Sequence, residues 1–182
     1  MDALVMAGGQ GTRLGRGEKP LCEIGGVPMV DRVLRALEDS EIDRALVVTS
    51  PQTPATAAHV SAPVVETPGD GYVADLGVAL ERVSLPVLTV VADLPLLSGA
   101  VVDRILDATG TDSTTVCVPA DLPHRLGATV DRTTTVDGRT AVPTGVNVVG
   151  ATDRTETLIM HEPTLAVNVN RPRDARVAEA LA

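Results

Sequence analysis

The only lysine of this 182-residue chain, Lys19, lies in a glycine-rich stretch near its start. That stretch, AGGQGTRLGRGEKPL (residues 7–21), also contains Arg13 and glycines at positions 8, 9, 11, 15 and 17. Glycines let backbone N–H groups turn toward an anion, arginine grips phosphate oxygens at two points, and lysine adds a compact charge. The spacing is neither that of the P-loop nor that of the dinucleotide-binding GxGxxG. We therefore predict a phosphate-binding loop of another kind, with Arg13 and Lys19 as its cations.

Two further polar positions could act together with this loop. Asp93 follows the run PVLTVVA (residues 86–92), which has the pattern of a buried strand. A carboxylate at the end of a strand can hold Mg²⁺ where the metal also meets phosphate oxygens, although a turn or helix-capping role beside Pro95 explains Asp93 equally well. Asn168, in VNVNRPRDA (residues 167–175), is the second candidate contact to metal or phosphate, with a structural role at a strand end as its alternative.

The rest of the chain reads as an alternating series of strands and helices. Apolar residues make up 44 % of it and Tyr72 is the only aromatic one, so we expect a core of Val, Leu, Ile and Ala, which suits buried parallel strands. Predicted strands cover residues 3–7, 21–24, 45–49, 64–65, 86–92, 115–118, 146–149 and 165–169, and predicted helices cover 28–37, 72–83, 101–108 and 173–181, the last capped by Asn170. This alternation predicts one three-layer α/β/α, Rossmann-like domain over residues 1–182 with a mixed, mainly parallel sheet. The polar segment 121–143 interrupts it, and we expect an insertion there on the substrate side.

Composition narrows the classes of function. The net charge is −9 and no basic stripe is visible, so no nucleic-acid partner is expected. The many aspartates and the single lysine resemble proteins of salt-loving archaea and predict unfolding when salt is removed. Cys22 and Cys117 lack metal-ligand spacing and are expected to be buried thiols in a reducing cytoplasm. We see no secretory leader and no membrane span, so we expect a cytoplasmic protein, and its assembly, a homo-oligomer included, is left open.

The glycine-rich loop and the EKPL that ends it resemble the pyrophosphorylase loop of the MobA-like nucleotidyltransferase superfamily. This superfamily includes the sugar-1-phosphate nucleotidylyltransferases and the molybdenum-cofactor guanylyltransferases. The resemblance implies that the loop wraps the phosphates of a nucleoside triphosphate, through Ala7, Gly8, Gly9, Gln10, Gly11, Thr12, Arg13 and Lys19. It also implies that Asp93, in a DxP motif shared with the family, is a Mg²⁺ ligand. VNVNRPRDA is similar to the family's NINTPEDL segment, in keeping with Asn168 as a further ligand.

Over most of its length the chain is similar to the archaeal GTP:adenosylcobinamide-phosphate guanylyltransferases. The similarity rests on MDALVMAGG at the start, TSPQTP (49–54), GDGYVADL (69–76) and VPTGVNVV (142–149). It implies that GMP passes from GTP to adenosylcobinamide phosphate with release of pyrophosphate and without a covalent intermediate. Arg13, Lys19 and Asp93 would be catalytic, and the guanine would lie near Ser50 and Gly71.

Two alternatives stay open at this point. One is a nucleotidyltransferase that uses another phosphorylated acceptor, such as the molybdenum cofactor, a phosphosugar or phospholactate. PGDGY (residues 68–72), in place of the Gly-Pro-Leu-(Ala/Gly)-Gly usual in the molybdenum-cofactor enzymes, disfavours that acceptor. The other alternative is a GTP-binding protein without transfer activity, which the combination of Arg13, Lys19 and Asp93 disfavours.

Overall fold

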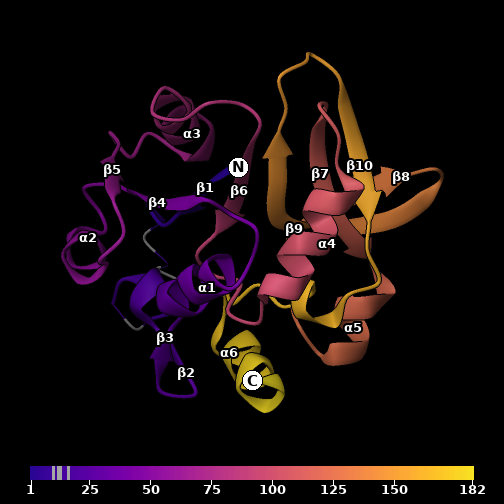
Figure 1. Ribbon diagram of the computed structural model, residues 1–182. Helices are drawn as coiled ribbons and strands as arrows, with labels where there is room; N and C mark the ends of the chain where they lie inside the picture. The colour runs from indigo at the N-terminus through magenta and orange to yellow at the C-terminus, as the bar shows by residue number, and fades with distance from the viewer. Residues whose placement is uncertain (10, 12–13, 16) are drawn as a thin grey trace.

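The computed structural model describes residues 1–9, 11, 14–15 and 17–182. Within these residues, eight strands form one sheet in the order β10-β7-β9-β6-β1-β4-β5, with β8 paired to β9 (Figure 1). The strands are β1 (Asp2–Met6), β4 (Arg44–Thr49), β5 (Val64–Glu66), β6 (Val87–Val91), β7 (Ser113–Pro119), β8 (Thr134–Val136), β9 (Arg139–Val149) and β10 (Thr155–Ile159). A separate hairpin consists of β2 (Glu23–Ile24) and β3 (Val27–Pro28).

The direction of the strands brings several strand ends together at one edge of the sheet. β1 is parallel to β4 and β6, and the register places Met6 beside both Val48 and Val91. β9 is antiparallel to β6 and β7, so its earlier residues lie at the edge where β6 ends, with Val146 beside Val90. The prediction of a mixed, mainly parallel sheet is therefore confirmed, and this carboxyl edge is where ligands bind in open α/β sheets.

Helices cover both faces of this sheet. They are α1 (Met29–Glu38), α2 (Pro54–His59), α3 (Tyr72–Leu80), α4 (Gly99–Ala108), α5 (Asp121–Leu126) and α6 (Pro172–Leu181). Val33 of α1 and Ile105 of α4 belong to the same buried cluster as Val5 of β1. Leu4, the preceding strand residue, instead packs in the cluster of Ala79 from α3. Successive residues of β1 thus face opposite layers, as the period of a strand requires, and the α/β/α class is confirmed.

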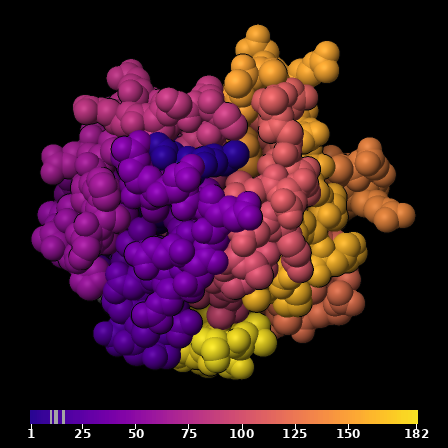
Figure 2. Space-filling view, viewed as in Figure 1, coloured from indigo at the N-terminus to yellow at the C-terminus, as the bar shows by residue number. Residues whose placement is uncertain are grey.

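The last helix packs below the carboxyl edge. Ala175 and Ala178 of α6 share a buried cluster with Ile24 of β2 and with Val167 and Val169. Figure 2 shows α6, in yellow, between the indigo and purple N-terminal part of the chain and the orange C-terminal part. The edge is therefore supported by residues from both ends of the sequence.

The predicted strand at residues 165–169 is wrong. Pro163–Leu165 forms a short 3₁₀ turn, and the residues after it form no strand. The alternation V-N-V-N does bury Val167 and Val169 completely. The backbone does not join a strand ladder, however: the N–H of Val169 donates to the carbonyl of Asp93, far away in the sequence, at 2.9 Å.

The polar segment 121–143 has regular structure of its own. It contains α5 and β8 and enters β9, and α2 and β10 are further elements that the sequence did not predict. Thr134–Val136 pairs with Arg139–Ala141, which makes a hairpin that extends β9. The proposed role of this segment toward the substrate stays a prediction.

Candidate active site

A cavity of about 500 Å³ lies at the carboxyl edge of the sheet. Met6, Val91 and Ala92, at and just beyond the ends of β1 and β6, line it together with residues of the glycine-rich loop. Lys19, in the 3₁₀ turn η1 (Lys19–Leu21), and Asp93 also face this space. Its volume is in the range typical of sites for small molecules.

Close packing requires glycine at position 11 of the loop and favours it at position 8. A Cβ on Gly11 would lie 2.2 Å from Cβ of Lys19, and Gly11 also has a φ of +60°. A Cβ on Gly8 would lie 3.2 Å from Cβ of Ser50. The Ser50 hydroxyl, just after β4, donates to the carbonyl of Gly8 at 2.8 Å. The loop is therefore fitted directly against the end of β4 on one side and against η1 on the other.

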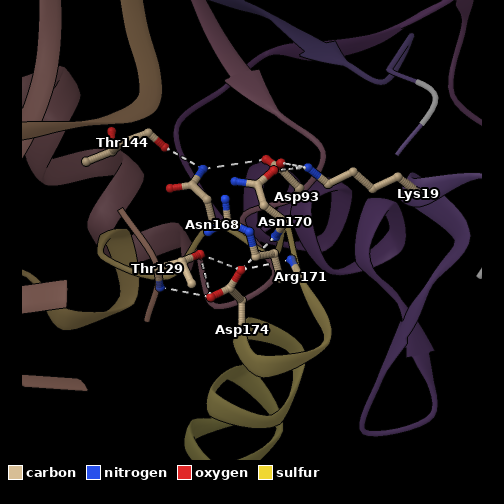
Figure 3. A network of polar contacts seen from close by, with 8 residues as sticks. All are labelled: Lys19, Asp93, Thr129, Thr144, Asn168, Asn170, Arg171 and Asp174. Atoms are coloured by element: carbon tan, nitrogen blue, oxygen red, sulfur yellow. Dashed lines mark hydrogen bonds and ion pairs between the residues drawn. The ribbon is translucent and has the colours of Figure 1, made fainter. Parts of the chain in front are cut away.

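Lys19 and Asp93 form an ion pair that includes a third side chain (Figure 3). The Lys19 ammonium also donates to Oδ1 of Asn170 at 2.6 Å. The side chains of Lys19 and Asp93 are only 14 % and 15 % exposed, so water screens their charges less than it would at the surface. The fold thus gathers a cation, a carboxylate and an amide oxygen that are far apart in the sequence, a combination suited to phosphate and metal chemistry.

Asn168 lies beside this group but presents a different atom. Its Nδ2 donates to the carbonyl of Thr144 at 3.0 Å and lies 3.5 Å from Oδ1 of Asp93. The antiparallel β9 supplies that carbonyl. Because Mg²⁺ binds the oxygen of an amide, Asn170 is better oriented than Asn168 to act as a ligand in this arrangement. The assignment of Asn168 as a ligand stays a prediction.

Asp174, which is completely buried, holds the segment that carries Asn170. Its carboxylate accepts hydrogen bonds from the backbone N–H groups of Asn170 (3.1 Å) and Arg171 (2.9 Å). It also accepts from the N–H and the hydroxyl of Thr129, at 2.9 and 2.8 Å. The expectation that Asn170 caps α6 is therefore wrong: Arg171 is the N-cap residue, and the acceptor is the carboxylate one turn into the helix.

Glu18 fixes the backbone just before Lys19. Its carboxylate accepts from the N–H groups of Ala55 (2.8 Å) and Thr56 (2.7 Å) and from the Thr56 hydroxyl (2.7 Å). These groups belong to the first turn of α2, whose partial positive charge favours an anion. Burial raises the pKa of Glu18, but the hydrogen bonds from Thr56 and Ala55 outweigh it, so the pKa lies below its ordinary value. Glu18 thus joins η1 to α2.

Most of the residues predicted from the sequence do converge. Lining the cavity are Ala7, Gly8, Gly9, Lys19, Gly71 and Asp93. Ser50 and Gly11 support the loop and Lys19, as described above, and Asn168 adjoins Asp93. Gln10, Thr12 and Arg13 lie outside the described residues, so their predicted contacts with phosphate stay predictions.

Other residues of the site were not predicted in these roles. Glu18 immediately precedes the lysine, and a carboxylate at this point of a loop gave no signal of its distant partner. Asp174 could have been found, because an acidic side chain three positions after a helix N-cap often accepts a hydrogen bond from the backbone N–H of the N-cap residue. Asp75 lines the cavity, yet in the sequence it lies within an ordinary helical pattern. Asn170 was assigned to the helix and not to Lys19.

Residues 3–179 match the MobA-like NTP transferase domain family. The chain belongs to this family. It is 32 % identical, over 200 aligned positions, to the adenosylcobinamide-phosphate guanylyltransferase of Methanocaldococcus jannaschii. That alignment covers 100 % of this chain and 97 % of the relative. The MobA-like protein described here is thus a nucleotidyltransferase, and the cavity at its carboxyl edge is the candidate active site.

Solved structures show the same fold at low sequence identity. A hypothetical transferase from Thermus thermophilus has a TM-score of 0.75 at 20 % identity, with 96 % of this chain and 98 % of that one covered. A putative glucose-1-phosphate thymidylyltransferase from Bacillus anthracis has a TM-score of 0.72 at 14 % identity, with 100 % and 95 % covered. The fold of this MobA-like transferase is therefore that of nucleotidyltransferases.

Two features are absent from the described residues. These residues contain no group of three or more His, Cys, Asp or Glu side chains arranged to hold a metal ion. None of the helices in the described part of the chain combines the length and the apolar character needed to cross a membrane.

Proposed function

We propose that this MobA-like transferase moves GMP from GTP to adenosylcobinamide phosphate, with adenosylcobinamide-GDP and pyrophosphate as products. The observation that carries the proposal is the end-to-end similarity to the Methanocaldococcus jannaschii relative, at 32 % identity. The site supports it, because the glycine-rich loop, Lys19 and Asp93 line one cavity of suitable size. GTP as the donor and the cytoplasm as the location are parts of this proposal.

In the proposed reaction an oxygen of the acceptor phosphate attacks the α-phosphorus of GTP. The bond from that phosphorus to the oxygen that bridges to the β-phosphorus breaks, and the electron pair leaves with pyrophosphate. Both partners are anions, so the protein acts by alignment and by neutralising charge. Lys19 supplies an ammonium held in place by Asp93 and Asn170, the backbone N–H groups of the loop supply further donors, and Arg13 supplies a second cation.

The side chains around Asp93 fit a Mg²⁺ ion that is bound together with the substrate. One carboxylate and an amide oxygen, from Asn170 or from a reoriented Asn168, are too few for a closed site. Mg²⁺ usually keeps several waters and takes phosphate oxygens as its remaining ligands. The ion supplies positive charge at the reacting phosphates. Asp93→Asn is expected to stay folded and to lose Mg²⁺-dependent activity, which a Mg²⁺ titration with circular dichroism as a control would measure.

We assign the acceptor side of the site to the polar segment 121–143, as part of one domain. Thr129, within this segment, donates a hydrogen bond to the carboxylate of Asp174, which also accepts the N–H of Asn170. Through that shared carboxylate, a displacement of the segment would be transmitted to the group around Lys19. The acceptor and the donor phosphates would thereby be positioned by one connected set of contacts.

Pyrophosphate release measured with a panel of acceptors tests the proposal. Purified protein, Mg²⁺ and GTP would be mixed with adenosylcobinamide phosphate, molybdopterin, glucose 1-phosphate or phospholactate. We expect release only with the corrinoid and formation of its GDP derivative by mass spectrometry. Release with another acceptor would reassign the substrate, and GTP binding without release in any mixture would favour a non-catalytic GTP-binding protein.

A further inference from the structure

The cavity has two chemically different parts. One is formed by the glycine-rich loop, Lys19 and Asp93, where the phosphates are proposed to bind. The other is formed by Gln52, after β4, and by Tyr72 and Asp75 of α3. Lys19 is the only cation among the described residues that line the cavity, and the second part carries a carboxylate instead. Because a triphosphate would be repelled there, the second part suits the uncharged nucleoside end of the substrate.

Asp75 is placed to contact a ligand in this second part. The residue is only 7 % exposed, and it lines the cavity. Its Oδ1 accepts the N–H of Gly69 at 2.9 Å. Oδ2 has no hydrogen-bond partner among the residues that the structure describes. Every fully buried side-chain oxygen of those residues does have a partner, so Oδ2 is not fully buried. Oδ2 therefore keeps accessible surface, and because Asp75 lines the cavity we infer that this surface faces it.

We propose that Asp75 selects guanine as the base of the nucleotide, an inference that rests on the proposed function for GTP as the donor. The Watson–Crick edge of guanine offers two adjacent donors, N1–H and the 2-amino group. A carboxylate accepts both, in the same way that it accepts two parallel hydrogen bonds from arginine. Adenine instead presents a lone pair at N1 and lacks the 2-amino group, so the carboxylate repels it. Selection thus arises from attraction to one base and repulsion of another.

Tyr72 complements Asp75 without choosing between purines. It lies three residues earlier on α3, on the same side of the helix, and its side chain is exposed at the cavity. An aromatic ring can stack on the face of any base. Tyr72 is therefore assigned to affinity, and Asp75 to the choice of base.

The test compares binding of GTP, ITP and XTP to the full chain by calorimetry, with Mg²⁺ and without any acceptor. ITP lacks the 2-amino group, and XTP has a carbonyl oxygen in its place. The wild type is expected to bind GTP about 10- to 100-fold more tightly than ITP, the effect of one hydrogen bond to a charged group. In Asp75→Asn, one amide oxygen can still accept the Gly69 N–H, but an NH₂ group replaces the second oxygen. This variant should bind GTP about 10- to 100-fold more weakly and XTP at least about tenfold more tightly than the wild type.

Asp70→Asn is the matched control, because Asp70 is exposed and does not line the cavity. It removes the same charge from the loop just before α3 and should leave all three affinities unchanged. The proposal is overturned if Asp75→Asn weakens all three nucleotides by one common factor, as loss of a structural contact would, or if it keeps the preference for GTP. It is also overturned if the wild type binds ITP as tightly as GTP, even when transfer occurs. A wild type that prefers GTP but transfers nothing to adenosylcobinamide phosphate would contradict the proposed function and leave this assignment standing.

Discussion

Lys19→Met removes the ammonium group but keeps a side chain of similar length, so Asp93 and Asn170 lose their cation. Both members of the ion pair are about 85 % buried, which leaves the Asp93 charge poorly compensated. The expected loss of stability is about 3 kcal/mol, the lower end of the range for breaking a buried pair. For a chain of this size it corresponds to a fall in Tm of about 6–12 °C. The same change should lower kcat by about 100-fold or more, since it removes a positioned donor to the reacting phosphates.

A double-mutant cycle separates these two effects. In Lys19→Met/Asp93→Asn both charges are gone, so the stability loss should be smaller than the sum of the single losses by about 2 kcal/mol. The kcat should stay low in the double variant. Urea unfolding and pyrophosphate release at saturating GTP measure the two quantities. Arg44→Met, which breaks the exposed pair with Asp2 at the other end of β1, is the control, with about 1 kcal/mol or less lost and kcat unchanged. Additive energies, or a kcat of Lys19→Met within about tenfold of the wild type, would refute the reasoning.

Glu18→Ala should reduce stability by about 1–2 kcal/mol and also lower kcat, because three hydrogen bonds that hold η1 to α2 are lost; an unchanged kcat would show that Lys19 does not need this support. Gly11→Ala should lower kcat more than Gly15→Ala, since both positions have positive φ but only the Cβ at position 11 meets Lys19; equal effects would contradict the contact. The pKa of Glu18 is lowered in the folded protein, and so is that of Glu162, where burial raises the pKa but hydrogen bonds from Arg104 and Thr164 outweigh it. The contribution of both to stability is therefore complete above about pH 4.5 and is lost as pH falls through the lowered values. The urea midpoint should therefore drop below that pH, and the drop should shrink in Glu18→Gln; a midpoint that rises on acidification would contradict the sign.

Sequence reasoning could find Lys19 because it is the only lysine and lies in a glycine-rich loop, and Asp93 because it is a carboxylate at the end of a buried strand. Each follows a buried strand, either directly or through the loop, and parallel strands end at one edge. The alternation of apolar and polar residues at positions 167–170 correctly indicated which side chains are buried. It could not indicate whether a neighbouring strand pairs with the segment, and none does in the described part of the chain. Periodicity reports burial, whereas a strand also needs a partner.

The choice between Asn168 and Asn170 could not be made from the sequence. Both are polar positions of the same alternating segment, and only their distant partners distinguish them. Asn168 meets the carbonyl of Thr144 because β9 is antiparallel, and Asn170 meets Lys19 because Asp174 fixes its backbone. Those contacts depend on tertiary register, which a single sequence does not encode in any local pattern.

A crystal structure of the protein with GTP and Mg²⁺ tests most directly whether the cavity is a nucleotidyl-transfer site. The phosphates are expected within hydrogen-bond distance of the Lys19 ammonium and of the N–H groups of the glycine-rich loop, with the metal on Asp93. A nucleotide bound elsewhere, with Lys19 making no contact to any phosphate oxygen, would contradict the account.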